Sequence, residues 1–480
     1  MKFISVVTIC IIIFWGGLWR LSAADQEKID FSEAIRIIDT WLEAQREYDR
    51  LPGISAAVVK DQEVIWSKGY GMADLHKKSR TTPSTIYSIC SISKLFTSIA
   101  IMQLRDAGKL RLDDRVADVL PWFNLKQQYP ESGPITVRSL LTHSSGLPRE
   151  SAHPYWTGPD FPFPTSKQVK DKLGGQKTLY PSSTYFQYSN LGLSLLGEIV
   201  AHVSGLSFEE YVNKNILTPL RLADTRPKLP EKLWGGKLAA GYSAVTREGN
   251  RNKVAFFQAR GITPAAGFSS TVEDLARFAS WQFRLLEKGG KEILRASTLR
   301  EMQRVHWMDP DWKTTWGLGF SVYKVDSRTF VGHGGSCPGY RSTLVLDPQK
   351  KWAYIVMINA SGTNPGKYAT GMREILAKAK KPDKEDKGPQ VDLEAYSGVY
   401  DPQPWGSETI VVPWQGKLAV FSLPTDSPAK HMTLLKYEKA NTFRRLRKNK
   451  ELAERVVFER DKSGKVICMI WNHNIRKKIK

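Results

Sequence analysis

Hydrophobic residues near the start of the chain recur at helical spacing and then give way to short strand-like runs. An apolar stripe within residues 31–45 predicts an amphipathic helix, and it is formed by Ile35, Ile38, Trp41 and Leu42. Residues 54–59 and 64–70 are apolar runs joined by a polar connection, which predicts a β-hairpin. The chain is therefore expected to begin with a helix followed by antiparallel strands.

The long middle of the chain favours helices, and strand-like runs return only near His333 and residues 342–346. Residues 95–104 are mostly apolar without Gly or Pro, and Asp106-Ala107-Gly108 is a stop signal. We expect a helix there, beginning at about Ser91. Strands at both ends of a helical middle predict an α+β fold, a sheet flanked by helices, rather than a doubly wound fold.

The composition changes after residue 377. Residues 378–390 are charged, poor in apolar side chains and interrupted by proline, which predicts a linker. Short strand-like runs separated by turn residues follow, at 409–412, 417–423, 455–459 and 465–471. Residues 391–480 are thus expected to form a small antiparallel β-barrel or β-sheet domain.

The first residues resemble an export signal. Lys2 precedes an apolar run from Phe3 to Leu18, and Ser22-Ala23-Ala24 supplies small residues for cleavage, so we expect a signal peptide over residues 1–24. The alternative is an uncleaved anchor, but the apolar run spans only about 24 Å as a helix, short of a hydrocarbon core of roughly 30 Å. We expect a periplasmic or secreted protein whose first folded domain covers residues 25–377.

The chain is strongly basic, with a formal net charge of +22. Its Lys and Arg residues are scattered among acidic ones and accompany no nucleic-acid-binding signature, so we expect no nucleic-acid partner. Peripheral contact with anionic cell wall or membrane surfaces is the most that the charge predicts. Three cysteines follow the signal segment, Cys90, Cys337 and Cys468, and this odd number argues against a disulfide framework. Cys90 and Cys337 are expected to lie near each other as small apolar groups. No ligand spacing predicts a metal, and we expect no cofactor.

Ser91-Ile92-Ser93-Lys94 is the candidate for catalysis. At a helix start this spacing sets a hydroxyl and an amine on one face, and the amine becomes a base if burial or nearby positive charge destabilises its ammonium form. The alternative is a helix cap with a solvated lysine. The tetrapeptide alone is weak evidence, because Ser321 to Lys324 and Ser427 to Lys430 match it too.

Two further motifs follow in order: Tyr188-Ser189-Asn190 and His333-Gly334-Gly335. With the Ser91 motif they make the chain resemble the serine β-lactamase and penicillin-binding protein superfamily, in the branch of class C β-lactamases, D-aminopeptidases, DD-peptidases and family VIII carboxylesterases. The resemblance implies an antiparallel sheet flanked by helices, a helical subdomain, and a lipocalin-like C-terminal domain. Another match to the second motif, Tyr211 to Asn213, is expected to be structural, as is His143 in the segment Thr142-His143-Ser144.

The resemblance also implies roles for single residues. Ser91 is expected to be the nucleophile, with Lys94 and Tyr188 moving its proton, and which of the two is the principal base stays open. Asn190 is expected to hold Lys94 or a substrate amide. His333, Gly335 and Ser336 are expected to form a substrate-binding strand edge, with the backbone N–H groups of Ser91 and Ser336 as the oxyanion hole.

The third motif departs from the Lys-Thr-Gly form, and this departure narrows the substrate. His333 and Gly334 offer neither a fixed charge nor a hydroxyl to an anionic substrate. We therefore expect an exported serine hydrolase that acts on amide or ester bonds, in D-amino-acid peptides or small esters, with weak or no β-lactamase activity. Its substrate would be a small molecule or a short peptide, and peptidoglycan is the candidate source. The alternatives are a class C-type β-lactamase and a catalytically weak protein that binds or senses cell-wall peptides.

Overall fold

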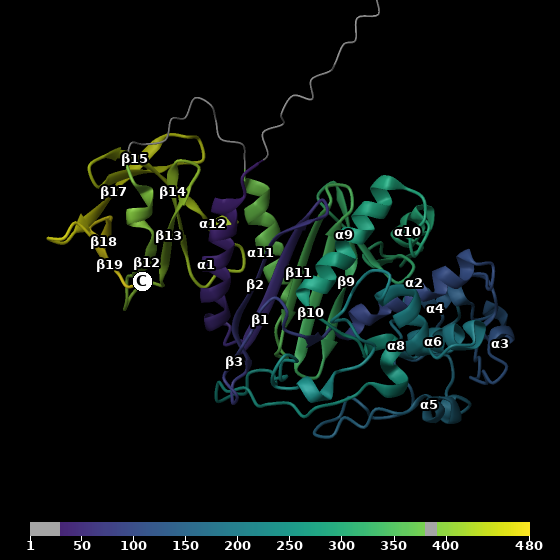
Figure 1. Ribbon diagram of the computed structural model, residues 1–480. Coiled ribbons are helices and arrows are strands. Elements are labelled where there is room, and N and C mark those ends of the chain that lie inside the picture. Colours follow the sequence, from purple (N-terminus) through teal and green to yellow (C-terminus); the bar gives the residue numbers. More distant parts are fainter. Residues whose placement is uncertain (1–28, 380–390) are drawn as a thin grey trace, which may run out of the picture.

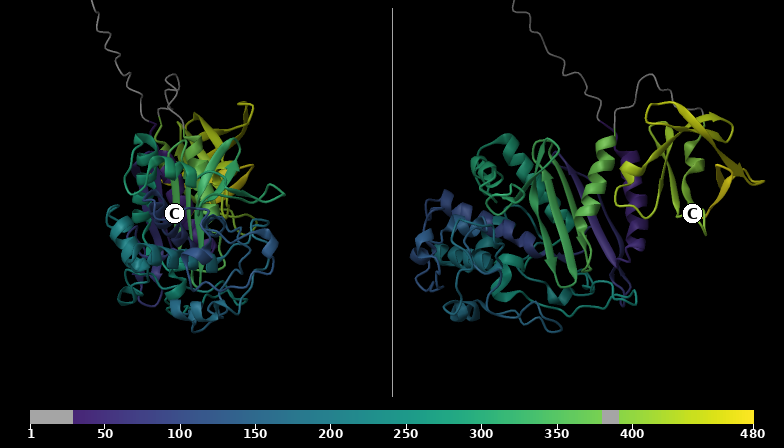
Figure 2. Two further views of the ribbon diagram at one scale, coloured as in Figure 1. Left: turned by 90° about the vertical axis from the view of Figure 1, so that its right-hand side faces the viewer. Right: turned by 180° about the vertical axis from the view of Figure 1, so that it is seen from behind.

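The computed structural model describes residues 29–379 and 391–480, which form a larger part built around a β-sheet and a β-barrel beside it (Figure 1). The expected signal peptide at residues 1–24 lies outside the described residues. So does nearly all of the expected linker at 378–390. The two parts stand side by side along the long axis of the molecule, as the view from behind also shows (Figure 2).

A nine-stranded antiparallel sheet is the centre of the larger part. Its strand order is β3-β2-β1-β11-β10-β9-β8-β7-β6. The bounds are β1 (Gly53–Lys60), β2 (Glu63–Asp74), β3 (Ser79–Arg80), β6 (Trp307–Met308), β7 (Thr315–Trp316), β8 (Ser321–Val325), β9 (Arg328–Cys337), β10 (Tyr340–Asp347) and β11 (Trp352–Ile358). The adjacent strands β1 and β11 are buried on both faces, because helices cover both sides of them. The expected α+β class and the antiparallel sheet are confirmed.

Two helices cover the face of the sheet that is turned toward the barrel. They are α1 (Ser32–Tyr48) and α11 (Pro365–Lys378), and they pack closely because Gly371 lies directly against the ring of Trp41. A side chain at position 371 would overlap with that ring. On the opposite face lies α9 (Val272–Lys288), which contacts β1 and β11.

The helical subdomain lies at the end of the sheet opposite the barrel (Figure 1). Its main helices are α2 (Ser93–Asp106) and α6 (Asn190–Ser204), which pack against each other. The shorter helices are α3 (Val116–Val119), α4 (Val137–Leu141), α5 (Ser166–Leu173), α7 (Phe208–Val212), α8 (Thr263–Ala266) and α10 (Ala296–Met302). The single turns in this part of the chain are η1 (Cys90–Ile92), η2 (Pro130–Ser132), η3 (Asn213–Leu217), η4 (Glu231–Leu233) and η5 (Arg260–Ile262), and β4 (Tyr87–Ser88) pairs with β5 (Ser269–Ser270). The turn η6 (Leu393–Tyr396) belongs to the barrel.

The C-terminal part is a closed eight-stranded barrel. Its strands are β12 (Gly398–Asp401), β13 (Thr409–Trp414), β14 (Lys417–Ser422), β15 (Thr433–Lys439), β16 (Thr442–Leu446), β17 (Leu452–Arg460), β18 (Val466–Trp471) and β19 (Asn474–Lys478), and β12 pairs with β19 to close it. Aromatic and aliphatic side chains fill the interior, among them Tyr396, Tyr400, Phe443, Phe458 and Met469. The interior is therefore a packed core, as is usual for a barrel of this size.

The outer wall of the barrel is attached to α1 and α11. Trp414 and Phe421 belong to the same buried cluster as Ile38 and Trp41 of α1. The indole of Trp41 also donates a hydrogen bond to Thr425 O at 2.8 Å. Since the helices separate the barrel from the sheet, the barrel stands on the side of the molecule away from the helical subdomain.

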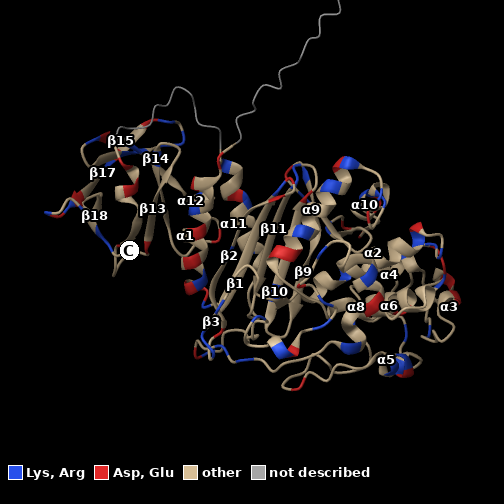
Figure 3. Ribbon diagram, viewed as in Figure 1, with Lys and Arg blue, Asp and Glu red and all other residues tan. Residues whose placement is uncertain are grey.

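Charge is spread over both parts of the chain (Figure 3). Among the described residues no single helix is long and apolar enough to cross a membrane. Two adjacent helical segments, residues 190–204 and 208–217, are together long and apolar enough for a span, but they are bent by 79° relative to each other.

Candidate functional site

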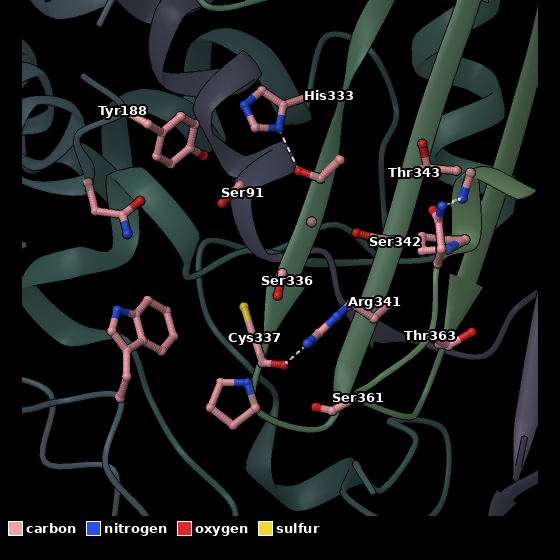
Figure 4. Close-up of a pocket in the computed structure, with 18 of the residues that line it drawn as sticks. Ser91, Tyr188, His333, Ser336, Cys337, Arg341, Ser342, Thr343, Ser361 and Thr363 are labelled. Atoms are coloured by element: carbon pink, nitrogen blue, oxygen red, sulfur yellow. Dashed lines mark hydrogen bonds between the residues drawn. The ribbon is translucent and has the colours of Figure 1, made fainter. Parts of the chain in front are cut away.

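Ser91 lines a cavity of about 760 Å³ between the helical subdomain and the end of β9 (Figure 4). The residue lies in the single turn η1, two positions before the first residue of α2. Cys90 before it has φ 52°, a left-handed conformation that is uncommon for a non-glycine residue and that concentrates at functional sites. The expected helix start is therefore confirmed, with the nucleophile candidate on a tight turn that leads into the helix.

Lys94 is completely buried beneath Ser91. Its Nζ donates to Ser91 Oγ at 3.2 Å, to Asn190 Oδ1 at 2.7 Å and to Ala265 O at 2.8 Å. Burial holds the pKa of Lys94 well below its usual value, with Glu150 raising it and Arg149 lowering it further. When the amine is neutral, its two N–H bonds are held by Asn190 and Ala265, and its lone pair is left to accept the Ser91 proton.

Tyr188 lies in the same cavity, just before α6. The ring of His143 packs on it with centroids 4.3 Å apart, and Lys94 Nζ lies 4.7 Å from its centroid. Desolvation raises the pKa of Tyr188, while its interaction with Ser91 and the charge of Arg149 lower it. The phenol is therefore protonated at neutral pH, which suits a group that relays or donates a proton better than a primary base.

His143 packs against the ring of Tyr188 and contacts the second motif. It is buried, and its Nδ1 accepts a hydrogen bond from the backbone N–H of Ser189 at 3.1 Å. Burial holds the pKa of His143 well below its usual value, and the charge of Lys94 adds to the effect. The structure thus places His143 as a neutral ring that orders the second motif.

Asn190 is the first residue of α6, and its side-chain amide forms hydrogen bonds both to Lys94 and to Glu150 in a loop. Its Oδ1 accepts from Lys94, and its Nδ2 donates to both carboxylate oxygens of Glu150, at 2.9 and 3.0 Å. Glu150 was not anticipated from the sequence, because it stands in an irregular loop and belongs to none of the three motifs.

The third motif forms an open strand edge. β8 pairs with β9 only from Val325 to Ser321, which is opposite Gly332, so the edge of residues 333–337 that faces the cavity is free of β8. On its other side this segment pairs with β10, where Ser336 is opposite Arg341. Gly335 has to be glycine, because a side chain there would overlap with the carbonyl of Ile89 beside the nucleophile turn.

His333 is a neutral imidazole. Burial and the neighbouring Lys94 ammonium lower the pKa of His333 to about 3. Its Nδ1 donates to Gly334 O, which leaves Nε2 as an acceptor, and Nε2 is buried without a partner among the described residues. In Figure 4 the ring stands between β9 and Tyr188. Ser91, Tyr188, Asn190, His333, Gly335 and Ser336 all line one cavity, with Lys94 directly beneath it.

Cys90 and Cys337 form a disulfide, with their Cα atoms 5.6 Å apart. Their expected closeness is confirmed, but the prediction that they are only small apolar groups is wrong. The odd number of cysteines gave the wrong expectation, because two of the three form a disulfide and the third, Cys468 in the barrel, remains free. The bond links the residue before Ser91 to the residue after Ser336, so it ties together the two expected oxyanion-hole segments.

A family model described as Beta-lactamase matches residues 38–378, the span that contains all three motifs. The chain belongs to the beta-lactamase family. Protein flp from Staphylococcus aureus (strain NCTC 8325 / PS 47) is 27% identical over 333 residues, 67% of this chain. Beta-lactamase-like protein 2 from Dictyostelium discoideum is 27% identical over 367 residues, 73% of this chain. The chain spans only 62% and 64% of the lengths of these two relatives.

Solved structures agree with the family in fold. The octameric penicillin-binding protein homologue from Pyrococcus abyssi has a TM-score of 0.63 and 25% identity, covering 92% of this chain and 100% of that one. A D-stereospecific amidohydrolase from Streptomyces sp. has a TM-score of 0.57 and 22% identity, covering 71% of this chain and 97% of that one. At that identity the second likeness concerns the fold alone.

The competing tetrapeptides lie away from this family site. Ser321 and Lys324 belong to β8, and Ser427 and Lys430 lie beside the barrel at α12 (Pro428–His431). Tyr211, the start of the second Y-x-N match, is on α7. None of these residues lines the cavity with Ser91.

Arg341 is a cavity residue that the sequence did not single out. Its Nη1 donates to the carbonyls of Cys337 and Tyr340, at 2.9 and 2.8 Å. Within residues 29–379 and 391–480 it has no ion-pair partner. His333 and Gly334 themselves supply no fixed charge, and the guanidinium in this part of the cavity comes from Arg341 on the neighbouring strand β10.

Proposed function

We propose that the protein is a serine hydrolase that forms an acyl-enzyme on Ser91 from amide or ester substrates. The observation that carries this proposal is the environment of Lys94. A buried amine with two fixed acceptors and one contact to Ser91 Oγ is arranged to lose its own proton and then to accept the proton of the serine.

In the first step Ser91 Oγ attacks the substrate carbonyl carbon while its proton passes to Lys94 Nζ. The carbonyl π electrons move to oxygen, and the backbone N–H groups of Ser91 and Ser336 stabilise the resulting oxyanion. The bond to the leaving nitrogen or oxygen then breaks, and that atom takes a proton relayed from Lys94 through Tyr188. Water later attacks the acyl ester, releases the acid and restores the Ser91 hydroxyl, with the same groups acting in reverse.

The guanidinium of Arg341 in the cavity supports a substrate that carries a carboxylate near the scissile bond. Arg341 has no acidic partner among the described residues, and a guanidinium offers paired donors to such a group. Short D-amino-acid peptides and small esters of this kind fit the proposal. β-Lactams also carry a carboxylate, but Gly334 contributes no hydroxyl beside it, and we keep weak β-lactamase activity as the prediction.

We also propose that the protein is exported and acts outside the cytoplasm on peptidoglycan-derived or other small substrates. This part of the proposal is supported by the sequence of residues 1–24, whose apolar run and small residues are typical of a signal peptide. Cell fractionation of the full chain and N-terminal sequencing of the mature protein test it. Recovery in the cytoplasm with residues 1–24 intact would contradict it.

The catalytic proposal is tested with a fluorophosphonate probe and a substrate panel. The panel contains p-nitrophenyl esters, D- and L-aminoacyl amides, muramyl peptides and nitrocefin, each measured with wild type and Ser91→Ala. We expect probe labelling and hydrolysis of short esters or D-aminoacyl amides that disappear in Ser91→Ala, with slow nitrocefin turnover. No Ser91-dependent adduct with any reagent would favour a peptide-binding role instead, and fast nitrocefin hydrolysis would favour a class C-type β-lactamase.

A further inference from the structure

Glu150 is a residue of the candidate site that none of the three sequence motifs contains. It lines the cavity, and its side chain is only 23% exposed. Three donors make four contacts with its carboxylate: Asn190 Nδ2, which reaches both oxygens, Arg149 Nε at 3.2 Å, and the hydroxyl of Tyr155. A carboxylate with this many partners is held rigidly, so whatever it touches is held as well.

The chemistry of the carboxylate decides how Asn190 is turned. An ionised carboxylate only accepts hydrogen bonds, whereas an amide has one accepting and one donating end. The NH₂ end of Asn190 must therefore face Glu150, and the oxygen end must face Lys94. If the amide were reversed, two acceptors would meet at Glu150 and two donors at Lys94.

The orientation of Asn190 in turn determines where the Lys94 lone pair points. A neutral amine has two N–H bonds, and Asn190 Oδ1 and Ala265 O take both. Only Ser91 Oγ is then left opposite the lone pair. If Asn190 Oδ1 moved away, the amine could turn one N–H toward Ser91 and would no longer accept its proton.

We propose that Glu150 is a positioning residue, which fixes the amide of Asn190 and through it aims the lone pair of Lys94 at Ser91. This inference rests on the proposed function, since it assigns Glu150 a part in the same acylation step. Glu150 touches neither Ser91 nor Lys94, and it acts only through Asn190.

Glu150 has two opposing effects on Lys94. Its hydrogen bonds orient the neutral amine toward Ser91, whereas its negative charge disfavours the neutral form. It favours the ammonium and so raises the pKa of Lys94, while burial and Arg149 lower it. The other titratable groups around the amine are Tyr188, His143 and His333, and both histidines are neutral at neutral pH. A change that removes the charge but keeps the acceptor therefore separates the two effects.

Glu150→Gln and Glu150→Leu make this separation. Gln keeps an oxygen that can accept from Asn190 Nδ2, and Leu has none. We expect Glu150→Leu to lower kcat/KM for p-nitrophenyl acetate about 10²-fold, since misplacing a reacting group costs this much. Glu150→Gln should stay within about 10-fold at its plateau and shift the ascending limb of the pH profile to lower pH.

Glu198→Leu is the matched control. Glu198 is also 23% exposed and ion-paired, to Lys170, but it lies on α6 away from the cavity. Thermal unfolding of all the variants separates loss of folding from loss of positioning. Equal losses in Glu150→Gln and Glu150→Leu, or a wild-type rate and pH profile in folded Glu150→Leu, would overturn the inference.

A second measurement does not depend on turnover. The pKa of Lys94 is followed by NMR of ¹³C-labelled lysine, assigned with Lys94→Met, in wild type, Glu150→Gln and Glu198→Gln. We expect a lower pKa only in Glu150→Gln, and an unchanged value there contradicts the coupling to Glu150. Absence of Ser91-dependent hydrolysis in wild type would instead overturn the proposed function, so the two failures are distinct.

Discussion

Lys94 Nζ is closer to Asn190 Oδ1, at 2.7 Å, than to the Ser91 hydroxyl that it is arranged to activate, at 3.2 Å. The shorter bond is made to an atom that does not react, so it holds the amine in place before and after the proton moves. In the proposed mechanism, the longer contact is the one along which the proton moves from Ser91 Oγ to Lys94 Nζ. Lys94 and Asn190 belong to motifs that are far apart in the chain. In the proposed mechanism, the hydrogen bond between their side chains determines whether Lys94 can act as the base for Ser91.

Lys94→Arg should remove the base while keeping a positive charge. A guanidinium is not deprotonated in proteins, so it cannot accept the Ser91 proton. We expect kcat/KM for ester hydrolysis to fall by about 10²- to 10⁴-fold, the usual contribution of a general base. Stopped-flow measurement of acyl-enzyme formation checks this, with exposed Lys324→Arg as the control at the unrelated tetrapeptide. A Lys94→Arg enzyme that acylates at the wild-type rate would show that Tyr188 suffices.

The rate should depend on pH through Lys94 as well. Because its pKa lies well below the usual 10.5, the neutral amine becomes populated well before that pH. We expect kcat/KM to rise with pH along one ascending limb whose midpoint lies below 10.5 in wild type. The profile is measured with an ester whose own hydrolysis is subtracted using Ser91→Ala. A limb centred near 10.5 would contradict the burial effect.

Arg341→Gln should change substrate preference rather than catalysis. Hydrogen bonds to charged groups contribute about 1.5–3 kcal/mol, so we expect kcat/KM for a carboxylate-bearing ester to fall about 10- to 10²-fold. A neutral ester of the same leaving group should be hydrolysed within about 3-fold of wild type, since it does not use that interaction. Arg304→Gln, at an exposed arginine outside the cavity, is the control. Equal effects on both esters would mean that Arg341 supports the strand and not the substrate.

Acid should destabilise the fold through His333. Its pKa is about 3 in the folded chain and near 6.5 when unfolded, so the unfolded chain binds one more proton between these values. The free energy of unfolding then falls as pH falls from 6.5 toward 3, by up to about 1.4 kcal/mol per pH unit from this one group. Urea unfolding from pH 7 to 4 should show a smaller slope in His333→Gln than in wild type. An unchanged slope in His333→Gln contradicts the assignment.

The barrel should unfold together with the larger part of the molecule, residues 29–379. Trp414 is buried between the barrel and α1, so Trp414→Ala is expected to cost about 3–5 kcal/mol in the free energy of unfolding. Calorimetry should give one transition in wild type. Trp405→Ala is the control, because that side chain is 69% exposed in the same domain. Two separate transitions in wild type would show that the interface does not couple the parts.

The sequence predicted the residues of the three motifs but not the groups that orient them. Ser91, Tyr188 and His333 could be found because each motif fixes several residue types at fixed spacing. Glu150 and Arg341 act from a loop and from a neighbouring strand, where neither spacing nor periodicity marks them. Their roles depend on which carbonyls and amides the fold brings to them, and single-sequence patterns do not contain that information.

The barrel was predicted as a class of domain, while half of its strands were not. β13, β14, β17 and β18 are rich in apolar side chains and were found. The strand-like pattern of β15 and β16 is weaker, because charged residues such as Lys436 and Arg444 occupy their outward positions. Away from the contact with α1 and α11, a strand of this barrel is buried on its inner face alone, so its alternating pattern is easily mistaken for a polar loop.

The edge of β9 that faces the cavity, residues 333–337, bears on which ligands the cavity would recognise. An unpaired strand edge offers main-chain donors and acceptors, and a ligand that lies along it is recognised as an added strand. Such recognition depends on the extended shape and free amides of the ligand more than on its side chains. Backbone N-methylation next to the scissile bond should therefore weaken a peptide substrate more than a change of its neighbouring side chain.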